Sequence, residues 1–266
     1  MSSETVLLEI AAPRATITLN RPEKRNAINR AMLAELEPVL MKVRDDATVR
    51  VVVLCGAGPA FCSGIDHALL AEISAQCRAG VPFRHLHGDL HRCLDVMVTM
   101  EKPVVALLHG VATGMGLELA LAADFRIAPA ACVIGLPEVA FGLIPDVGGT
   151  TRLTRLVGGH RAKELILTGV AMTAAAAPAG LMTRVAADEE AAAEELERLV
   201  AALSRHPALA VGLGKALVDR VADCDEATAK RLEGVYQTIL LQQPEIAQHF
   251  PAAVAFIQDQ IKNPRR

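Results

Sequence analysis

Hydrophobic runs divide the first half of the chain into alternating strand-like and helix-like segments. Two β-branched runs, at residues 5–10 and 15–19, are separated by Pro13 and Arg14, which predicts a hairpin-like pair of strands. Residues 49–55 form an almost unbroken apolar run, typical of a strand that is buried on both faces of a parallel sheet. Further strands are predicted at residues 103–109, 124–128 and 131–134.

Apolar positions with helical spacing lie between and after these strands. Asn29 can cap a helix that runs to about Asp45, in which Met32, Leu36 and Leu40 repeat at helical intervals. Further helices are predicted at residues 67–77, 84–100, 115–122, 188–204, 226–242 and 244–262. Strands and helices alternate up to about residue 135, and the pattern beyond about residue 145 is almost wholly helical. We therefore expect an α/β core over residues 1–204 and a helical region over residues 205–266.

Composition and charge exclude several classes of protein. The 266 residues are 52% hydrophobic, enough to bury a large core without disulfides. With 27 basic and 30 acidic residues, the chain has no basic field for nucleic acid or an anionic membrane. The six cysteines include no CxxC pair and lie mostly in apolar runs, which favours buried, reduced thiols. No signal peptide and no long apolar span is visible, so we expect a cytoplasmic protein.

Two strand–loop–helix junctions, at residues 51–66 and 103–118, carry the first chemical signal. Each has glycines where the backbone must turn sharply or approach a ligand. Free amides at the start of the following helices, if aimed at one point, would form an oxyanion hole, in which each donor contributes roughly 3–4 kcal/mol. Simple chain reversal is the alternative. A dinucleotide-binding loop does not fit, because Phe61 stands where the GxGxxG pattern needs its last glycine.

Three acidic residues interrupt apolar sequence, which is costly unless each is paired, caps a helix or is functional. Glu118 falls in the first turn of a predicted helix, where the helix dipole favours its charged form and burial opposes it. Asp146 is either the N-cap of a helix that starts at Val147, the interpretation that its local sequence favours, or a catalytic residue. Glu138 has no such structural explanation and is the strongest catalytic candidate.

Four segments, in order, resemble the signature blocks of the crotonase (enoyl-CoA hydratase/isomerase) superfamily over roughly residues 15–170. They read LNRPEKRNAIN, AFCSGID, GMGLELALAADFRIA and GLPEVAFGLIPDVGGTTRLTRLVG. The resemblance implies a spiral of ββα turns with a helical C-terminal region that builds trimers, often paired into hexamers. It also implies an acyl-CoA thioester substrate, with CoA as part of the substrate and no separate cofactor or metal.

The resemblance also implies roles for individual residues. The backbone N–H groups of Ile65 and Met115 would be the two oxyanion donors. The family commonly has glycine at the position of Met115, so this side chain puts the size of the acyl pocket in question. Lys24 would approach the nucleotide phosphates of CoA. The CoA arm would be contacted by Ile65, Asp66, His67 and Ala68.

Glu118 and Glu138 match the two glutamates of enoyl-CoA hydratases, which favours hydration. Dienoyl-CoA isomerases also resemble the chain, in SGID, in an acidic residue at position 118 and in Asp146, so isomerisation by Glu138 and Asp146 stays open. CoA-ester hydrolases of the superfamily share the Glu138 and Asp146 pattern but usually lack an acid at position 118. The alternative from another class is a non-catalytic acyl-CoA-binding scaffold on the same fold.

The HLHGDLH segment contains the one local cluster of histidines. His87 and His91 are four residues apart and can lie on one face of a helix. No third ligand is evident, so we interpret His85, His87 and His91 as a solvated helix face rather than a metal site.

Overall fold

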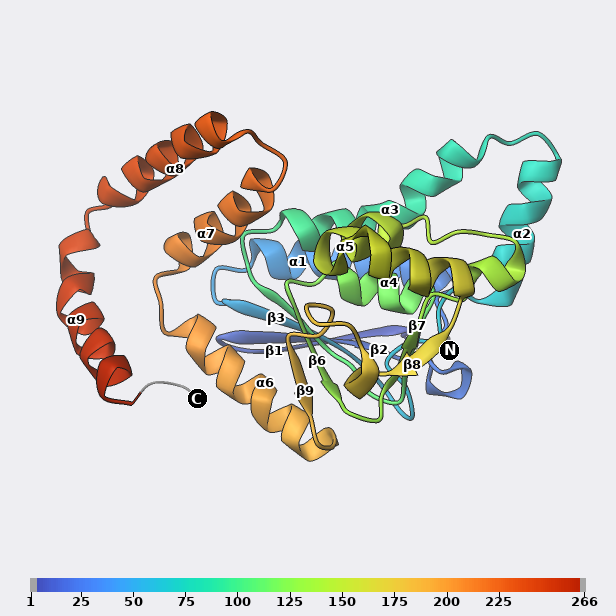
Figure 1. The fold of residues 1–266 in the computed structure, drawn as a ribbon, viewed down its shortest axis with the longest axis horizontal. Coiled ribbons are helices and arrows are strands. Elements are labelled where there is room, and N and C mark those ends of the chain that lie inside the picture. The colour runs from blue at the N-terminus through green and yellow to red at the C-terminus, as the bar shows by residue number, and fades with distance from the viewer. Residues whose placement is uncertain (1–3, 264–266) are drawn as a thin grey trace. The chain divides into compact units, whose positions relative to one another are not determined.

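The computed structural model describes residues 4–263 and divides into two compact units, the second of which begins at Arg205. The first unit contains all the strands of the described chain (Figure 1). They are β1 (Val6–Ala11), β2 (Arg14–Leu19), β3 (Val51–Gly56), β4 (Val104–Leu107), β5 (Val111–Thr113), β6 (Phe125–Pro129), β7 (Val133–Gly135), β8 (Ala171–Thr173) and β9 (Arg184–Ala186).

The larger sheet has the order β1-β2-β3-β4-β6-β9. The β1–β2 pair is antiparallel, which confirms the predicted hairpin, and every other pair in this sheet is parallel. A second sheet has the order β5-β7-β8. Along the chain, pairs of strands alternate with helices, as in the predicted ββα turns. The α/β prediction is therefore confirmed.

The central strand β3 is buried on both faces, as its apolar run predicted. Val52 and Leu54 join the larger hydrophobic cluster. Val51 and Val53 pack on the opposite face, in a cluster that includes Leu196 of helix α6 (Glu189–Ser204). Alternate residues of one strand therefore hold two helical layers on the sheet.

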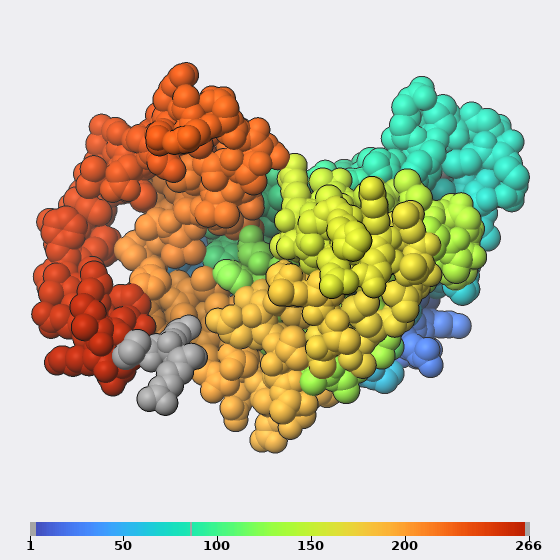
Figure 2. Space-filling view, in the orientation of Figure 1, coloured from blue at the N-terminus to red at the C-terminus, as the bar shows by residue number. Residues whose placement is uncertain are grey.

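The helices of the first unit are α1 (Arg30–Asp45), α2 (His67–Arg78), α3 (Phe83–Thr99), α4 (Met115–Leu121), α5 (Gly149–Thr168) and α6 (Glu189–Ser204), with short 3-10 helices η1 (Pro22–Lys24), η2 (Glu138–Phe141) and η3 (Ala174–Ala176). The predicted cap of α1 is confirmed, since the Asn29 side chain accepts a hydrogen bond from the Met32 amide at 2.9 Å. Helix α2 and the start of α3 project beyond the rest of the first unit (Figures 1 and 2).

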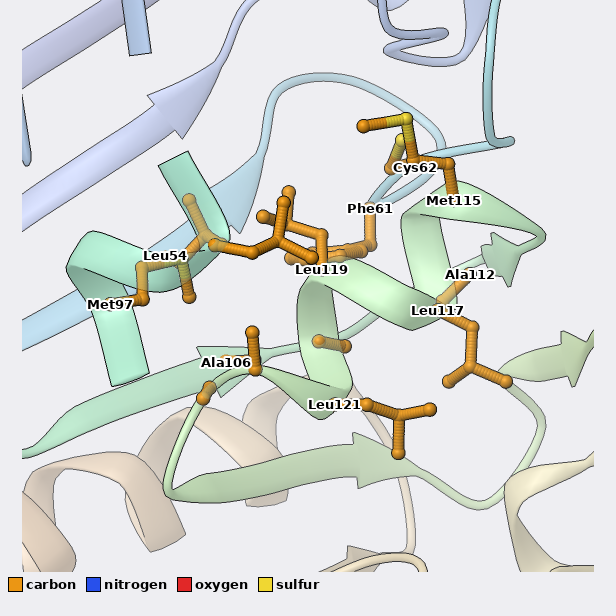
Figure 3. Close-up of a cluster of buried hydrophobic side chains, with 14 of the residues drawn as sticks. Leu54, Phe61, Cys62, Met97, Ala106, Ala112, Met115, Leu117, Leu119 and Leu121 are labelled. Atoms are coloured by element: carbon orange, nitrogen blue, oxygen red, sulfur yellow. The ribbon is translucent and has the colours of Figure 1, made fainter. Parts of the chain in front are cut away.

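Helix α4 is buried along its whole length. Leu117, Leu119 and Leu121 enter the core together with Met115 (Figure 3). Full burial of each such side chain stabilises the fold by roughly 1.5–3 kcal/mol. The packing fixes the start of α4, where the candidate catalytic residues gather.

Three strands were not predicted. Residues 111–113 were expected in a loop but form β5, and β8 and β9 interrupt a region expected to be almost wholly helical. Each is only three residues long, too short to show a strand periodicity.

The second unit contains only helices in its described part: α7 (Ala208–Val221), α8 (Glu226–Leu241) and α9 (Ile246–Lys262). Helices α7 and α8 pack on each other. Neither α8 nor α9 contains a buried residue. Over residues 4–263, no helix has the length and apolar character needed to cross a membrane.

Candidate active site

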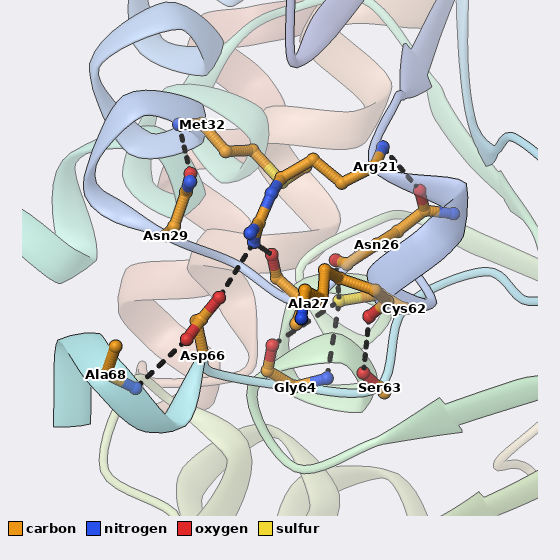
Figure 4. A network of polar contacts seen from close by, with 11 residues as sticks. Arg21, Asn26, Ala27, Asn29, Met32, Cys62, Ser63, Gly64, Asp66 and Ala68 are labelled. Carbon is orange, nitrogen blue, oxygen red and sulfur yellow. Dashed lines mark hydrogen bonds and ion pairs between the residues drawn. The ribbon is translucent and has the colours of Figure 1, made fainter. Parts of the chain in front are cut away.

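The loop that follows β2 pairs with the segment around Ile65, and buried Asn26 organises this loop (Figure 4). The side-chain amide nitrogen of Asn26 donates to the carbonyls of Ala57 and Ala60, at 2.9 and 2.7 Å. Its side-chain oxygen accepts from the backbone amide of Arg21 at 2.8 Å. Sequence reasoning missed Asn26. The signal available in the sequence was a polar residue inside the RNAI segment; the three backbone groups that its side chain satisfies are seen only in the structure.

Ile65 is held between two backbone hydrogen bonds to one neighbour. The Ile28 amide donates to the Gly64 carbonyl, and the Asp66 amide donates to the Ile28 carbonyl, both at 2.8 Å. The peptide on each side of Ile65 is thereby anchored, so its own N–H has a defined direction.

The residues predicted to contact the CoA arm lie at the start of α2. The Asp66 carboxylate accepts from the Ala68 amide at 3.0 Å as the N-cap of α2, and lies 3.0 Å from Arg21 Nη1 (Figure 4). The His67 ring lies 5.9 Å from the ring of Phe141. Lys24 ends η1 and is exposed. Contact of these residues with CoA stays a prediction.

The two glycine-containing junctions meet at Gly64 and Gly114. A Cβ on Gly64 would lie 2.9 Å from the Thr113 oxygen and 3.6 Å from the Met115 nitrogen. A Cβ on Gly114 would lie 3.1 Å from Glu138 Oε1, and both glycines have positive φ, 104° and 52°. This close approach brings the Met115 amide and the Glu138 carboxylate to one place, in a backbone conformation that favours glycine. The Met115 side chain itself is buried beside Cys62 (Figure 3).

Glu118 is only 2% exposed and lies in the first turn of α4. Its Oε1 accepts hydrogen bonds from the amides of Val147 and Gly149, at 3.0 and 2.9 Å. Burial raises the pKa of Glu118 to about 8, and the charges of Glu138 and Asp146 act in the same direction. Glu118 and its neighbours therefore retain a proton at a higher pH than ordinary carboxyl groups do.

Glu138 begins η2, directly after Pro137. Its buried Oε2 has no hydrogen-bond partner among residues 4–263. Burial raises its pKa, and the charge of Asp146 adds to the effect. A buried carboxylate oxygen without a partner is costly, which is typical of a functional group rather than a structural one.

The capping prediction for Asp146 was wrong. Helix α5 starts at Gly149, its N-cap is Gly148, and no side chain caps it. The Gly149 amide, which a capping Asp146 could have used, donates to Glu118 Oε1 instead. Burial raises the pKa of Asp146, and its charge affects both Glu118 and Glu138, so three carboxyl groups share one neighbourhood.

The histidine segment is only partly a solvated face. His85 is exposed, but the Nε2 atoms of His87 and His91 lie 2.8 and 3.0 Å from the main-chain oxygen of Asp146. No group of three or more His, Cys, Asp or Glu within residues 4–263 is arranged to hold a metal ion. The described cysteines are all free, and half of them are buried: Cys62, Cys93 and Cys132.

Comparison with known proteins identifies a family to which this chain is similar. The sequence model of the enoyl-CoA hydratase/isomerase family matches residues 9–248. The crotonyl-CoA hydratase of Syntrophomonas wolfei is 35% identical over 235 residues, 88% of each chain. The short-chain-enoyl-CoA hydratase of Clostridium acetobutylicum is 36% identical, again over 88% of each chain. A Thermobifida fusca protein crystallised with acetoacetyl-CoA superposes with a TM-score of 0.80 at 32% identity, over 90% of this chain and 95% of that one.

The fold and the carboxyl cluster define an acyl-CoA enzyme of the crotonase type. The chain belongs to the enoyl-CoA hydratase/isomerase family.

Proposed function

We propose that this protein adds water across the C2–C3 double bond of a 2-enoyl-CoA thioester. The observation that carries the proposal is the pairing of two buried carboxyl groups, Glu118 and Glu138, next to the Met115 amide. The similarity to two named enoyl-CoA hydratases supports it.

The site supports the following chemistry. The thioester oxygen accepts hydrogen bonds from the Ile65 and Met115 amides, which stabilise the enolate as negative charge develops there. Glu118 and Glu138 hold a water molecule at C3. The water oxygen bonds to C3, Glu138 gives a proton to C2, and the proton that leaves the water returns to the carboxyl pair. Two neighbouring carboxyl groups with raised pKa values hold the single proton that this exchange needs.

Isomerisation of an enoyl-CoA or dienoyl-CoA is the second candidate, and the position of Asp146 favours it. Because Asp146 caps no helix and its charge affects Glu138, its carboxylate is available for proton transfer. In this reaction Glu138 and Asp146 would move a proton between two carbons of a conjugated system, and no water would be added.

The finer features of the site follow as part of the same proposal. The CoA arm lies along Ile65, Asp66, His67 and Ala68, and Lys24 meets the nucleotide phosphates. We expect a role in fatty acid metabolism and a homotrimer or a dimer of trimers. The cytoplasmic location expected from the sequence stays a prediction.

Replacement of Glu138 tests the proposal. We expect Glu138→Gln to lower hydration of crotonyl-CoA by about 10²–10⁴-fold, because the proton donor to C2 is lost. The affinity for the CoA ester, measured by calorimetry, should change little, since the amide is isosteric. Loss of the enoyl absorbance measures turnover, and Glu190→Gln, at an exposed glutamate of α6, is the matched control. Full activity of Glu138→Gln would refute the assignment, and binding without turnover by the unaltered protein would support a scaffold.

Replacement of Asp146 separates the two reactions. If the enzyme is a hydratase, Asp146→Asn should retain crotonyl-CoA hydration to within about fivefold. The reason is that neither the protonation of C2 nor the removal of a proton from water uses Asp146. A 3-enoyl-CoA and a 3,5-dienoyl-CoA provide the isomerase assays. If the unaltered protein isomerises either one faster than it hydrates crotonyl-CoA, and Asp146→Asn abolishes that activity, the isomerase is correct.

A further inference from the structure

Two imidazoles from α3 converge on one main-chain oxygen beside the catalytic carboxyl groups. His87 Nε2 and His91 Nε2 lie 2.8 and 3.0 Å from the Asp146 carbonyl oxygen and 3.0 Å from each other. Their side chains are 37% and 22% exposed, so the pair is partly shielded from water. The proposed reaction assigns no role to either residue.

The carbonyl that the histidines contact belongs to the same peptide group that binds Glu118. The Val147 amide, on the other end of the Asp146–Val147 peptide bond, donates to Glu118 Oε1 at 3.0 Å. In a trans peptide the C=O and N–H point in opposite directions and are rigidly coupled. One planar group is therefore held by the imidazoles on one side and by Glu118 on the other.

The chemistry of each hydrogen bond, from the histidines through the peptide group to Glu118, defines which group donates and which accepts. A carbonyl oxygen only accepts, so each imidazole bonds to it only with its proton on Nε2, and the two Nε2 atoms, 3.0 Å apart, are then not hydrogen-bonded to each other. A donor at the carbonyl polarises the peptide and strengthens its N–H as a donor. The histidines thus strengthen the hydrogen bond that the Val147 amide donates to Glu118. They also help to fix the position of Glu118 Oε1.

Two carboxylate groups lie near the pair, and an arginine holds the neighbouring peptide group. Asp146 Oδ2 lies 3.7 Å from His87 Nε2, and Asp95 Oδ1 of α3 itself lies 3.9 Å from His91 Nδ1. Arg152 of α5 donates to the Val147 carbonyl at 3.0 Å, so the next peptide group is held as well. The turn that presents two amides to Glu118 is clamped at consecutive carbonyls.

We propose that His87 and His91 are positioning residues for Glu118 and act through the Asp146–Val147 peptide group. This rests on the proposed role of Glu118 in hydration. Neither histidine is assigned a contact with the substrate, so the expected signature is a change in kcat rather than in KM.

Paired substitutions test the proposal. We expect His87→Leu/His91→Leu to lower kcat for crotonyl-CoA about 10–100-fold with KM within about twofold, as for other residues that orient a catalytic group. Glutamine keeps an N–H donor near the Nε2 position, so His87→Gln/His91→Gln should recover kcat to within about threefold of the unaltered enzyme. His85→Leu, at an exposed position of the same helix, is the control and should have no effect. A glutamine variant as impaired as the leucine variant, or a loss confined to KM, would overturn the proposal.

Amide hydrogen exchange provides a readout that needs no turnover. In the leucine variant the Val147 amide should exchange at least about tenfold faster than in the unaltered protein, and the glutamine variant should retain slow exchange. The single variants His87→Leu and His91→Leu serve if the double variant does not fold. Unchanged exchange at Val147 in a folded leucine variant contradicts the positioning role, even if the unaltered protein hydrates no enoyl-CoA and the proposed function fails.

Discussion

At the residue scale, the protonation of Glu118 links catalysis to stability. Burial raises its pKa from the ordinary 4.5 to about 8 in the folded chain. Between these two values the folded state binds a proton that the unfolded state does not, so stability falls as the pH rises from about 4.5 to about 8. The buried Glu118 carboxyl, one of the catalytic pair, therefore carries a stability cost in alkaline solution.

Glu118→Gln should remove that cost. The amide stays neutral and its oxygen can still accept from the Val147 and Gly149 amides. We expect the free energy of unfolding of the variant, relative to the unaltered protein, to increase by a few kcal/mol between pH 5 and pH 8.5, since one pKa unit corresponds to about 1.4 kcal/mol. Urea unfolding at the two pH values measures the difference. With Glu190→Gln the difference should stay flat, and a flat difference with Glu118→Gln would contradict the raised pKa.

At the element scale, most of the long segments followed from the sequence, whereas three of the four three-residue strands in the described chain did not. The cap at Asn29 and the two-faced burial of β3 depend on local pattern, and both were predicted. The strands β5, β8 and β9 are three residues long and exist because distant segments pair, which no local window reveals.

The same reasoning explains where the candidate site could be predicted. Glu118 and Glu138 were recognised because acids in apolar sequence need a reason. The capping error at Asp146 arose because its local sequence suits a cap. The Val147 and Gly149 amides instead donate to Glu118, which lies 29 and 31 residues earlier in the chain than these two residues. The contacts of Asn26 and of the two histidines likewise join residues far apart in the chain.

The N-terminus of α2 offers a test at this scale. The amide of Ala68 lowers the pKa of Asp66, with the Arg21 pair acting in the same direction, which shows that the cap favours the carboxylate. We expect Asp66→Ala to reduce the free energy of unfolding by about 1–2 kcal/mol, because the cap and the ion pair are both lost. Asp66→Asn keeps a capping oxygen and should lose roughly half as much. Urea denaturation measures both, and equal losses for the two variants would assign the effect to the ion pair alone.

At the scale of the whole molecule, the second unit carries apolar side chains that nothing in the described chain buries. Phe250, Val254, Ile257 and Ile261 of α9 are 56%, 53%, 54% and 74% exposed. Their spacing of four, three and four residues places them on one face of the helix. An exposed apolar stripe of this kind is typical of a surface that meets another protein chain.

The oligomeric state tests whether that surface joins copies of this chain. We expect the unaltered protein to sediment as a trimer or a pair of trimers, because burial of the α9 stripe favours association by roughly 25 cal/mol per Å² of apolar area. Phe250→Glu/Ile257→Glu places two charges in the stripe and should shift the protein to monomers in analytical ultracentrifugation, since a buried unpaired charge is costly. Gln248→Glu adds a charge at an exposed position of the same helix away from the stripe, and should leave the assembly intact. Sedimentation of the unaltered protein as a monomer, or of the double variant as an undisturbed trimer, would show that the stripe does not hold the copies together.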